Sequence, residues 1–153
     1  MSIITLSKKA LPSGSIIQVK NLPLQTEIAT TSTSFIDVGT LTITPTNSSN
    51  KIFILSTLHI YLNYASANAW RAVNQNIKRD STDIFTDPLY GLADLSTSTD
   101  RLMVRDTVQF LDTPNTINQI TYKCQIKTSG TNTNINHPDF SDGGAFTLME
   151  VQA

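Results

Sequence analysis

The feature that most constrains this chain is its abundance of Thr, Ser and Asn, combined with a scarcity of helix-forming residues. Thr, Ser and Asn make up 49 of the 153 residues, whereas Glu occurs only twice. Thr favours strands, while Ser and Asn favour turns, because their short polar side chains compete with a helical backbone for hydrogen bonds. An all-helical protein is therefore not expected, and the composition favours an all-β fold.

The length and charge of the chain narrow its class further. With 153 residues it has the size of one ordinary domain that can bury a core without disulfides. Its net charge of −1 gives no reason to expect nucleic acid or an anionic membrane as a partner. One Cys and two His cannot supply a structural zinc site. The longest apolar run, 52–62, is too short to span a bilayer. We expect a soluble domain without a cofactor.

Short extended segments recur between turn signals. We expect an N-terminal arm over residues 1–14 and a β-sandwich domain over residues 15–153. Within it, Pro23 and Gly39 are expected to end strands, and residues 92–101 to form a polar loop. The predicted strands cover residues 15–20, 35–38, 41–44, 51–64, 70–79, 102–111, 117–128, 133–136 and 145–151. This spacing predicts an all-β, antiparallel sandwich with a jelly-roll-like topology.

The residues that carry chemistry do not assemble into a predicted catalytic site. No nucleophile elbow, phosphate-binding loop or dinucleotide-binding glycine pattern occurs in the sequence. His59 lies within an apolar strand, so we expect a hydrogen-bonded or interface histidine rather than a ligand. Cys124 lies on the apolar side of its strand, so we expect a buried, inert thiol rather than a nucleophile. Asp80 with Asp83 is a possible calcium pair, as is Asp139 with Asp142, but turn formation explains these residues equally well. We therefore expect no metal site and no enzyme.

Several segments, in this order, resemble a β-sandwich domain found in virion structural proteins of tailed bacteriophages, especially those of cyanobacteria and marine bacteria. The most specific is Phe110–Thr116, followed by the sequence Ile-Thr-Tyr-Lys at 120–123. A further turn at 79–84 carries Ser81 where the family usually has Gly. The other matching segments are 11–19, 33–39, 41–45, 51–55 and 147–151.

The resemblance implies a non-enzymatic component of the virion, usually a homotrimer, found in heads or at the tips of tail fibres. Because the chain reaches the domain within about a dozen residues of Met1 and shows no shaft, we expect a cement or decoration protein on the capsid surface. Its partner would be the major capsid protein of the head. We expect the arm to contact the shell, for example by adding a strand to a neighbour's edge. The arm residues with this predicted role are Ile3, Ile4, Leu6, Lys8 and Lys9, although both lysines could equally be solvated.

The alternative is a tail-fibre tip or tail adaptor that binds glycans on the host surface. Tyr64, Trp70 and Tyr90 lie near predicted loops, and aromatic side chains serve protein interfaces and sugar binding alike. Ordinary packing explains these three residues about as well. A glycan-cleaving enzyme is less favoured, because it needs two carboxylates facing each other across a cleft, and the sequence places no such pair.

Overall fold

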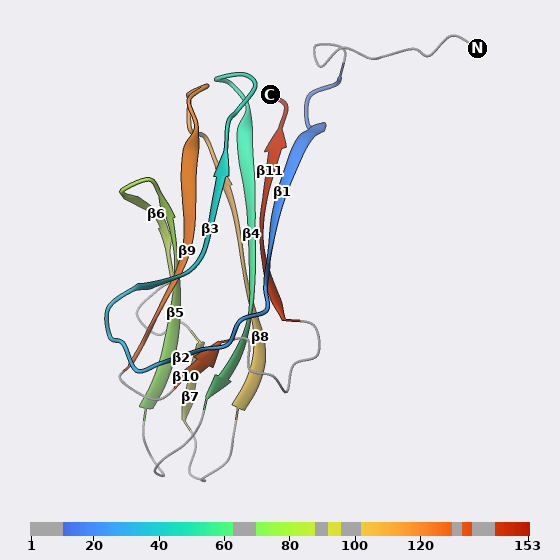
Figure 1. Cartoon of the computed structure of the whole chain (residues 1–153). Helices are drawn as coiled ribbons and strands as arrows, with labels where there is room; N and C mark the ends of the chain where they lie inside the picture. The colour runs from blue at the N-terminus through green and yellow to red at the C-terminus, as the bar shows by residue number, and fades with distance from the viewer. Residues whose placement is uncertain (1–10, 63–69, 88–91, 96–101, 130–132, 136–142) are drawn as a thin grey trace, which may run out of the picture.

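The computed structural model is a sandwich of two antiparallel β-sheets (Figure 1). It describes residues 11–62, 70–87, 92–95, 102–129, 133–135 and 143–153. Within those ranges the regular elements are all strands, and no helix is present that could cross a membrane. The strands are β1 Ile16–Leu24, β2 Ile28–Thr30, β3 Ile36–Ile43, β4 Lys51–Leu62, β5 Trp70–Arg79, β6 Thr82–Thr86, β7 Leu92–Leu95, β8 Leu102–Asp112, β9 Ile120–Thr128, β10 Thr133–Ile135 and β11 Gly144–Val151.

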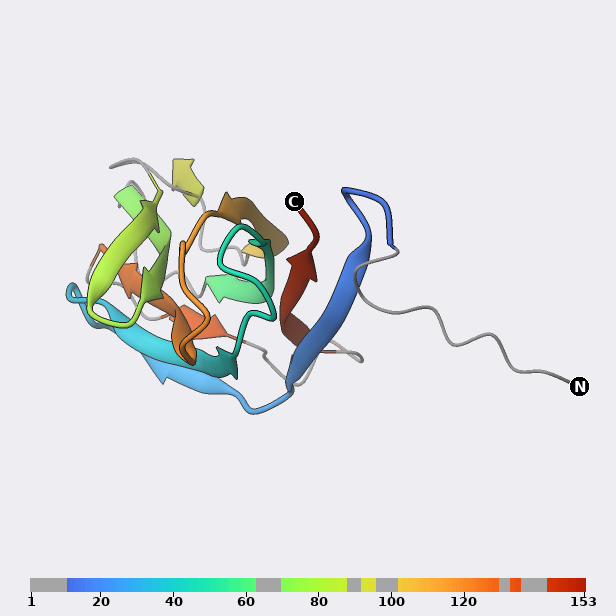
Figure 2. The ribbon, with the colours of Figure 1, turned by 90° about the horizontal axis from the view of Figure 1, so that it is seen from above.

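The strand order confirms the predicted jelly roll. In the first sheet, sheet A, β1, β11, β4 and β8 lie side by side, and β10 and β2 continue along the second half of β4. In the second, sheet B, the order is β3, β9, β5 and β6, with β7 beside the other end of β5. The chain switches repeatedly between two stacked sheets, as Figure 2 shows from above. This is how a double-sheet jelly roll protects most of its strand edges.

The core forms where alternate side chains of the two sheets meet. On β4, the residues of one parity, Ile52, Ile54, Leu58, Ile60 and Leu62, are fully buried. They pack with inward-facing side chains of β9 and β11 in one hydrophobic cluster, and each buried aliphatic side chain contributes roughly 1.5–3 kcal/mol. Cys124 is buried as predicted, and His59 is buried as well.

Two residues that are expected to end strands lie inside strands instead, and the strand expected from residue 117 begins only at Ile120. β1 continues through Pro23, which is the register partner of Ala145. Because β1 lies at the edge of sheet A and has a neighbouring strand on one side only, proline is tolerated there. β3 continues through Gly39, where the register shifts in a bulge. A Cβ at Gly39 would approach Leu24 Cδ2 to 3.1 Å, so glycine lets the two sheets come close rather than ending the strand.

One predicted loop is also partly wrong. Within the polar segment 92–101, residues Leu92–Leu95 form β7, which pairs with the first residues of β5, from Trp70 to Val73. Local sequence does not reveal such a short strand, because its stability comes from backbone pairing with a distant segment.

Candidate interaction surface

The outer side of sheet A carries an apolar surface that is assembled by strand register. Val19 on β1, Met149 on β11, Phe53 on β4 and Leu111 on β8 are successive register partners across four neighbouring strands. Register partners point to the same side of a sheet. The neighbour of Met149 in sequence, Leu148, is fully buried between the sheets, so the row that contains Met149 faces away from the core.

The apolar row belongs to a wider patch. Ile16, Val19 and Leu111 are 55%, 53% and 46% exposed, and the other members are half-buried. With four strands about 4.8 Å apart, the patch measures roughly 20 Å in each direction, or roughly 400 Å². We call it the outer apolar patch; its residues are Ile16, Val19, Phe53, Leu55, Leu111, Met149 and Val151.

A β-bulge is needed to build this patch. Strict alternation would place Ile16 and Val19 on opposite faces of β1, because three positions separate them. The register of β1 shifts between Ile16 and Gln18, however, so that Ile16 pairs with Val151 and Val19 pairs with Met149. Both exposed side chains therefore lie on the outer face, while Gln18 is the partner of the buried Glu150.

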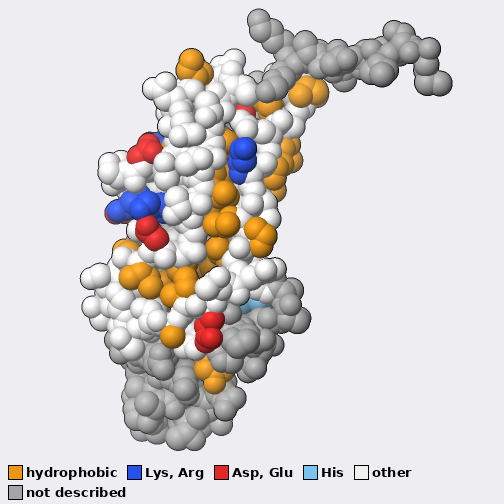
Figure 3. All heavy atoms as spheres, in the orientation of Figure 1, with side chains coloured by type: hydrophobic (Ala, Val, Ile, Leu, Met, Phe, Trp, Pro, Cys, Tyr) orange, Lys and Arg blue, Asp and Glu red, His pale blue; other side chains and the backbone are white. Residues whose placement is uncertain are grey.

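Polar side chains border the outer apolar patch. Lys51 continues the row of Ile16 and Val151. The hydroxyl of Thr147 donates to Asn21 Oδ1 at 2.7 Å, next to Leu55. In Figure 3, hydrophobic side chains lie along the right-hand margin, where β1 lies in Figure 1, and several acidic and basic side chains lie together on the opposite margin, above a further group of hydrophobic side chains. An apolar centre with a polar rim is typical of a protein interaction surface.

Glu150 fixes the orientation of β11 and hence of the patch. This fully buried carboxylate accepts hydrogen bonds from Gln18 Nε2 at 2.6 Å, the Thr46 N–H at 2.7 Å, the Thr46 hydroxyl at 2.8 Å and Asn50 Nδ2 at 2.6 Å. Burial raises the pKa of Glu150, but these hydrogen bonds lower it by more, so that its pKa lies below the ordinary value. Since Glu150 points inward, its neighbours Met149 and Val151 point outward.

A second buried carboxylate joins the two sheets. Asp112 on β8 accepts hydrogen bonds from Arg79 Nη1 on β5 at 2.9 and 3.0 Å and from the Tyr122 hydroxyl on β9 at 2.6 Å. Burial, reinforced by the hydrogen bond to Asp112, raises the pKa of Tyr122 far above its ordinary value. Because these polar groups satisfy one another in the interior, they hold the sandwich together rather than present a reactive group.

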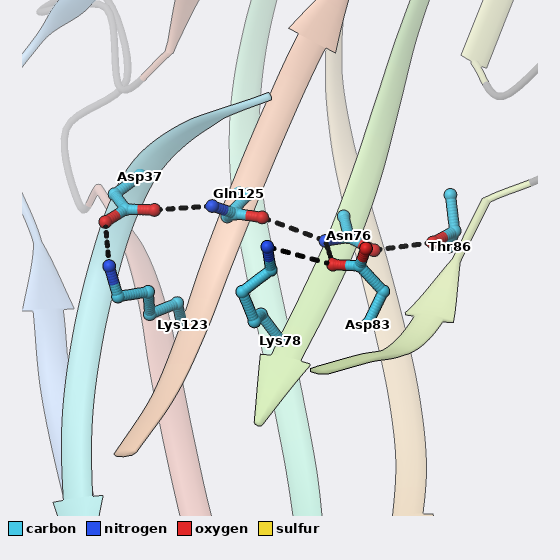
Figure 4. A network of polar contacts seen from close by, with 7 residues as sticks. All are labelled: Asp37, Asn76, Lys78, Asp83, Thr86, Lys123 and Gln125. Atoms are coloured by element: carbon cyan, nitrogen blue, oxygen red, sulfur yellow. Dashed lines mark hydrogen bonds and ion pairs between the residues drawn. The ribbon is translucent and has the colours of Figure 1, made fainter. Parts of the chain in front are cut away.

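The outer side of sheet B has the opposite character. Figure 4 shows a polar network that runs from β3 through β9 and β5 to β6. Asp37 accepts from Lys123 Nζ and Gln125 Nε2, each at 2.6 Å, and Gln125 Oε1 accepts from Asn76 Nδ2 at 2.9 Å. Asn76 Nδ2 also donates to Asp83 at 2.7 Å. The network is completed by Thr86, which donates to Asn76, and by Lys78, which pairs with Asp83 at 3.4 Å.

The network stabilises the ionised form of its carboxylates. Burial raises the pKa of Asp37, but the hydrogen bonds and charge of Lys123 and the hydrogen bond from Gln125 lower it by more, so that the net pKa is low. A hydrogen bond from Asn76 lowers the pKa of Asp83, and Lys78 lowers it further. This face therefore satisfies its charges internally.

One groove among the described residues is smaller than most small-molecule sites. A groove between β1 and β3, lined by Leu22, Leu24, Ile28 and Val38 among others, encloses about 190 Å³. Small-molecule sites usually enclose about 300–1,000 Å³. No group of three or more His, Cys, Asp or Glu side chains is close enough to hold a metal ion within the described ranges. Asp80 has a turn role, with φ of 52° and its carboxylate accepting from the Thr121 N–H at 2.9 Å.

The site residues predicted from sequence mostly fall outside the described part of the chain. Trp70 begins β5, but its side chain is not among the described ones. All other predicted contact residues lie in undescribed segments, namely Ile3, Ile4, Leu6, Lys8, Lys9, Tyr64 and Tyr90, as do Asp139 and Asp142. Their predicted roles stay predictions.

The outer apolar patch was missed by sequence reasoning. The pattern of residues 51–64 predicts a strand buried on both faces, with Phe53, Leu55 and Tyr61 on the second face. Tyr61 is buried as predicted, but Phe53 and Leu55 are only half-buried on the outer side of sheet A. The signal was present: Met149 and Val151 also occupy the parity opposite to the core residues of the last strand. Only the register shows that these two strands lie side by side.

Solved structures similar to this chain come from a virus and from a bacterium. VP2 of infectious bursal disease virus, in a subviral particle, has a TM-score of 0.51 at 13% identity, over 97% of this chain and 36% of that chain. A structure of the Gx strain of that virus has a TM-score of 0.46 at 11% identity, and the match covers 100% of this chain and 41% of that chain. Dimeric latent PorU of Porphyromonas gingivalis has a TM-score of 0.47 at 9% identity, and the match covers 97% of this chain and 14% of that chain.

These likenesses show the fold alone. The sequence matches no protein-family model and no curated protein. This chain spans about a third of the length of the VP2 chain, at 36%. The chain is thus an antiparallel β-sandwich of a type that a virus particle protein also contains.

Proposed function

We propose that this chain is a non-enzymatic structural protein of a virus particle and, more specifically, a trimeric cement or decoration protein on the capsid of a tailed bacteriophage. The observation that carries this proposal is the contrast between the two outer faces of the jelly roll. One face satisfies its polar groups within the subunit, while the other presents the outer apolar patch to solvent.

The energy available from the patch supports a role in assembly. Covering roughly 400 Å² of apolar surface contributes about 10 kcal/mol at about 25 cal/mol per Å². This is of the same order as the cost of about 4–15 kcal/mol for restricting the motion of two associating proteins. With additional rim contacts, association driven by this face is therefore energetically reasonable.

The fold and the sequence support a location in the virion. Double-sheet jelly rolls build many viral capsids, and VP2, which shares this fold, forms a subviral particle. The resemblance to phage virion proteins further supports a homotrimer, and it includes proteins of the phage head. In this proposal the arm contacts the major capsid protein through its apolar residues and its two lysines, namely Ile3, Ile4, Leu6, Lys8 and Lys9.

The test is to find the chain in purified virus particles. An antibody raised against the purified protein should label the whole head surface in electron micrographs, and quantitative mass spectrometry should give a copy number comparable to that of the capsid protein. A few copies confined to the tail would instead support the fibre tip or tail adaptor. Absence from particles, or hydrolysis of a polysaccharide by the purified protein, would contradict a virion structural role.

A further inference from the structure

We propose that neighbouring copies of this chain meet on the outer apolar patch, so that the patch is the subunit interface. This inference rests on the trimer in the proposed function and names the surface that makes it. The patch is a face of four hydrogen-bonded strands, not a set of scattered residues, since one register row runs unbroken from Val19 through Met149 and Phe53 to Leu111.

The breadth of the patch favours a second copy over a single extended segment. One extended segment covers a strip about 5 Å wide, the spacing of one strand, whereas the patch spans roughly 20 Å across four strands. A flat sheet face is covered best by another broad, flat surface. In a trimer the three patches would meet around the threefold axis, where together they bury roughly 1,200 Å² of apolar surface. Their polar rims add to this total, which is comparable with the roughly 1,200–2,000 Å² of a stable interface.

The unpaired strand edges beside the patch also favour an interface between copies of the chain. β1 and β8 flank it, and no described strand pairs with the outer edge of either one. β8 is 11 residues long, and an open edge of this length is prone to uncontrolled pairing. Copies that meet on the patch would shield these edges as well.

The other face of the sandwich is a poor candidate for the same contact. There, Asp37 and Lys123 form an ion pair at 2.6 Å, within a network that Gln125 and Asn76 complete. Burying this face would remove water from charges without offering new partners. A second copy therefore gains more by covering the apolar face.

The first test uses charged substitutions at exposed patch positions. Val19 and Leu111 are about half exposed, so arginine can be accommodated there in the isolated subunit without entering the core. Sedimentation velocity should show a trimer for the wild type and a monomer for the double variant V19R/L111R, with association weakened at least about 100-fold. The matched control is Ile117→Arg, since Ile117 is 61% exposed outside the patch. This control should remain a trimer.

The second test does not depend on disrupting the interface. Cys124 is the single cysteine, is fully buried, and has its pKa raised to about 12 by burial. An engineered cysteine is therefore the only thiol expected to react. In the trimer, V19C should react with a thiol reagent at least about tenfold more slowly than I117C, and dilution to monomers should remove the difference.

The outcomes separate the two levels of the proposal. A wild-type protein that stays monomeric at high concentration would contradict the trimer of the proposed function and this interface together. A stable wild-type trimer that survives V19R/L111R, with V19C as reactive as I117C, would overturn the interface alone and leave the trimer standing. Dissociation of the patch variant with retention of the Ile117→Arg control would support both.

Discussion

The two outer faces of this sandwich have similar strand geometry and opposite chemistry. On sheet B, the strands β3, β9, β5 and β6 each contribute a polar side chain that bonds to the next strand, from Asp37 on β3 to Thr86 on β6. On sheet A, the corresponding positions between β1 and β8 hold Val19, Met149 and Leu111. Cross-strand neighbours stand only about 4.5–5.5 Å apart, so each face is a nearly continuous chemical surface.

The comparison shows what each face can gain from a partner. A polar network that is already complete has little to offer, because a new contact must first remove water from satisfied groups. An apolar face gains from any complementary cover in proportion to the area removed from water. The proposed assembly through sheet A rests on this difference between the faces rather than on the fold itself.

The largest expected effect tests whether adjacent residues of β11 point to opposite sides of sheet A. Glu150→Ala should lower the free energy of unfolding by about 3 kcal/mol or more, because it leaves several buried donors without their charged acceptor. Met149→Ala, one position away on the outer face, should cost only about 1 kcal/mol. Urea denaturation of both variants measures this. Equal losses would mean that the parity of β11, and with it the patch, is wrongly assigned.

The second effect tests whether the polar face is self-sufficient. Asn76 is fully buried and bonds to Asp83, Gln125 and Thr86. Asn76→Leu should therefore lower the free energy of unfolding by about 2 kcal/mol, while the proposed trimer should stay intact in sedimentation velocity. Thr42→Val, at an exposed position on the same sheet, should change stability by less than about 0.5 kcal/mol. Dissociation of the Asn76 variant would show that sheet B takes part in assembly.

Sequence patterns predicted the sandwich well and its surface poorly, for a physical reason. The inward parity of β4 is visible locally, because Ile52, Ile54 and Leu58 repeat at the strand period. The patch is not visible locally, since it depends on which strands become neighbours and on the bulge that turns both Ile16 and Val19 outward. Register is set by tertiary pairing, which single segments do not encode.

The same limit explains the misplaced strand ends. Pro23 and Gly39 are strand breakers in isolation, yet both lie inside strands because their tertiary positions suit them. Pro23 lies in an edge strand, and Gly39 lies in a bulge against Leu24. The buried pairing of Glu150 with Gln18 was equally hidden, because the two residues are 132 positions apart.

Acid should weaken the fold more than it weakens association through the outer apolar patch. The pKa values of Asp37, Asp83 and Glu150 are lowered in the folded state. Stability from these groups is thus complete above their unfolded values of 3.8 for Asp and 4.5 for Glu. It is lost as the pH falls through the lower folded values. Burial raises the pKa of Asp87, which contributes with the opposite sign.

The measurement is a series of urea denaturations from about pH 7 down to about pH 3, where the unfolding midpoint should fall steadily below about pH 4.5. Asp37→Asn should flatten this fall slightly, because Asp37 is partly exposed. Sedimentation of protein that is still folded near pH 4.5 should show unchanged association, since none of the patch residues titrates. Loss of the trimer well before loss of the fold would point to a charged interface instead.

The smallest expected effect is the different response of the two faces to salt. Lys123 and Asp37 form a partly exposed ion pair, so Lys123→Met should cost at most about 0.5–1 kcal/mol at low ionic strength. In about 1 M NaCl the difference from the wild type should nearly vanish, because the Debye length falls to about 3 Å. Association through the outer apolar patch contains no ion pair to screen, so the same salt should leave the trimer as stable as before or strengthen it. Sedimentation and denaturation of one sample series report both quantities. A trimer that dissociates as NaCl is added would assign the subunit contact to charged groups and remove the contrast between the faces on which the proposed assembly depends.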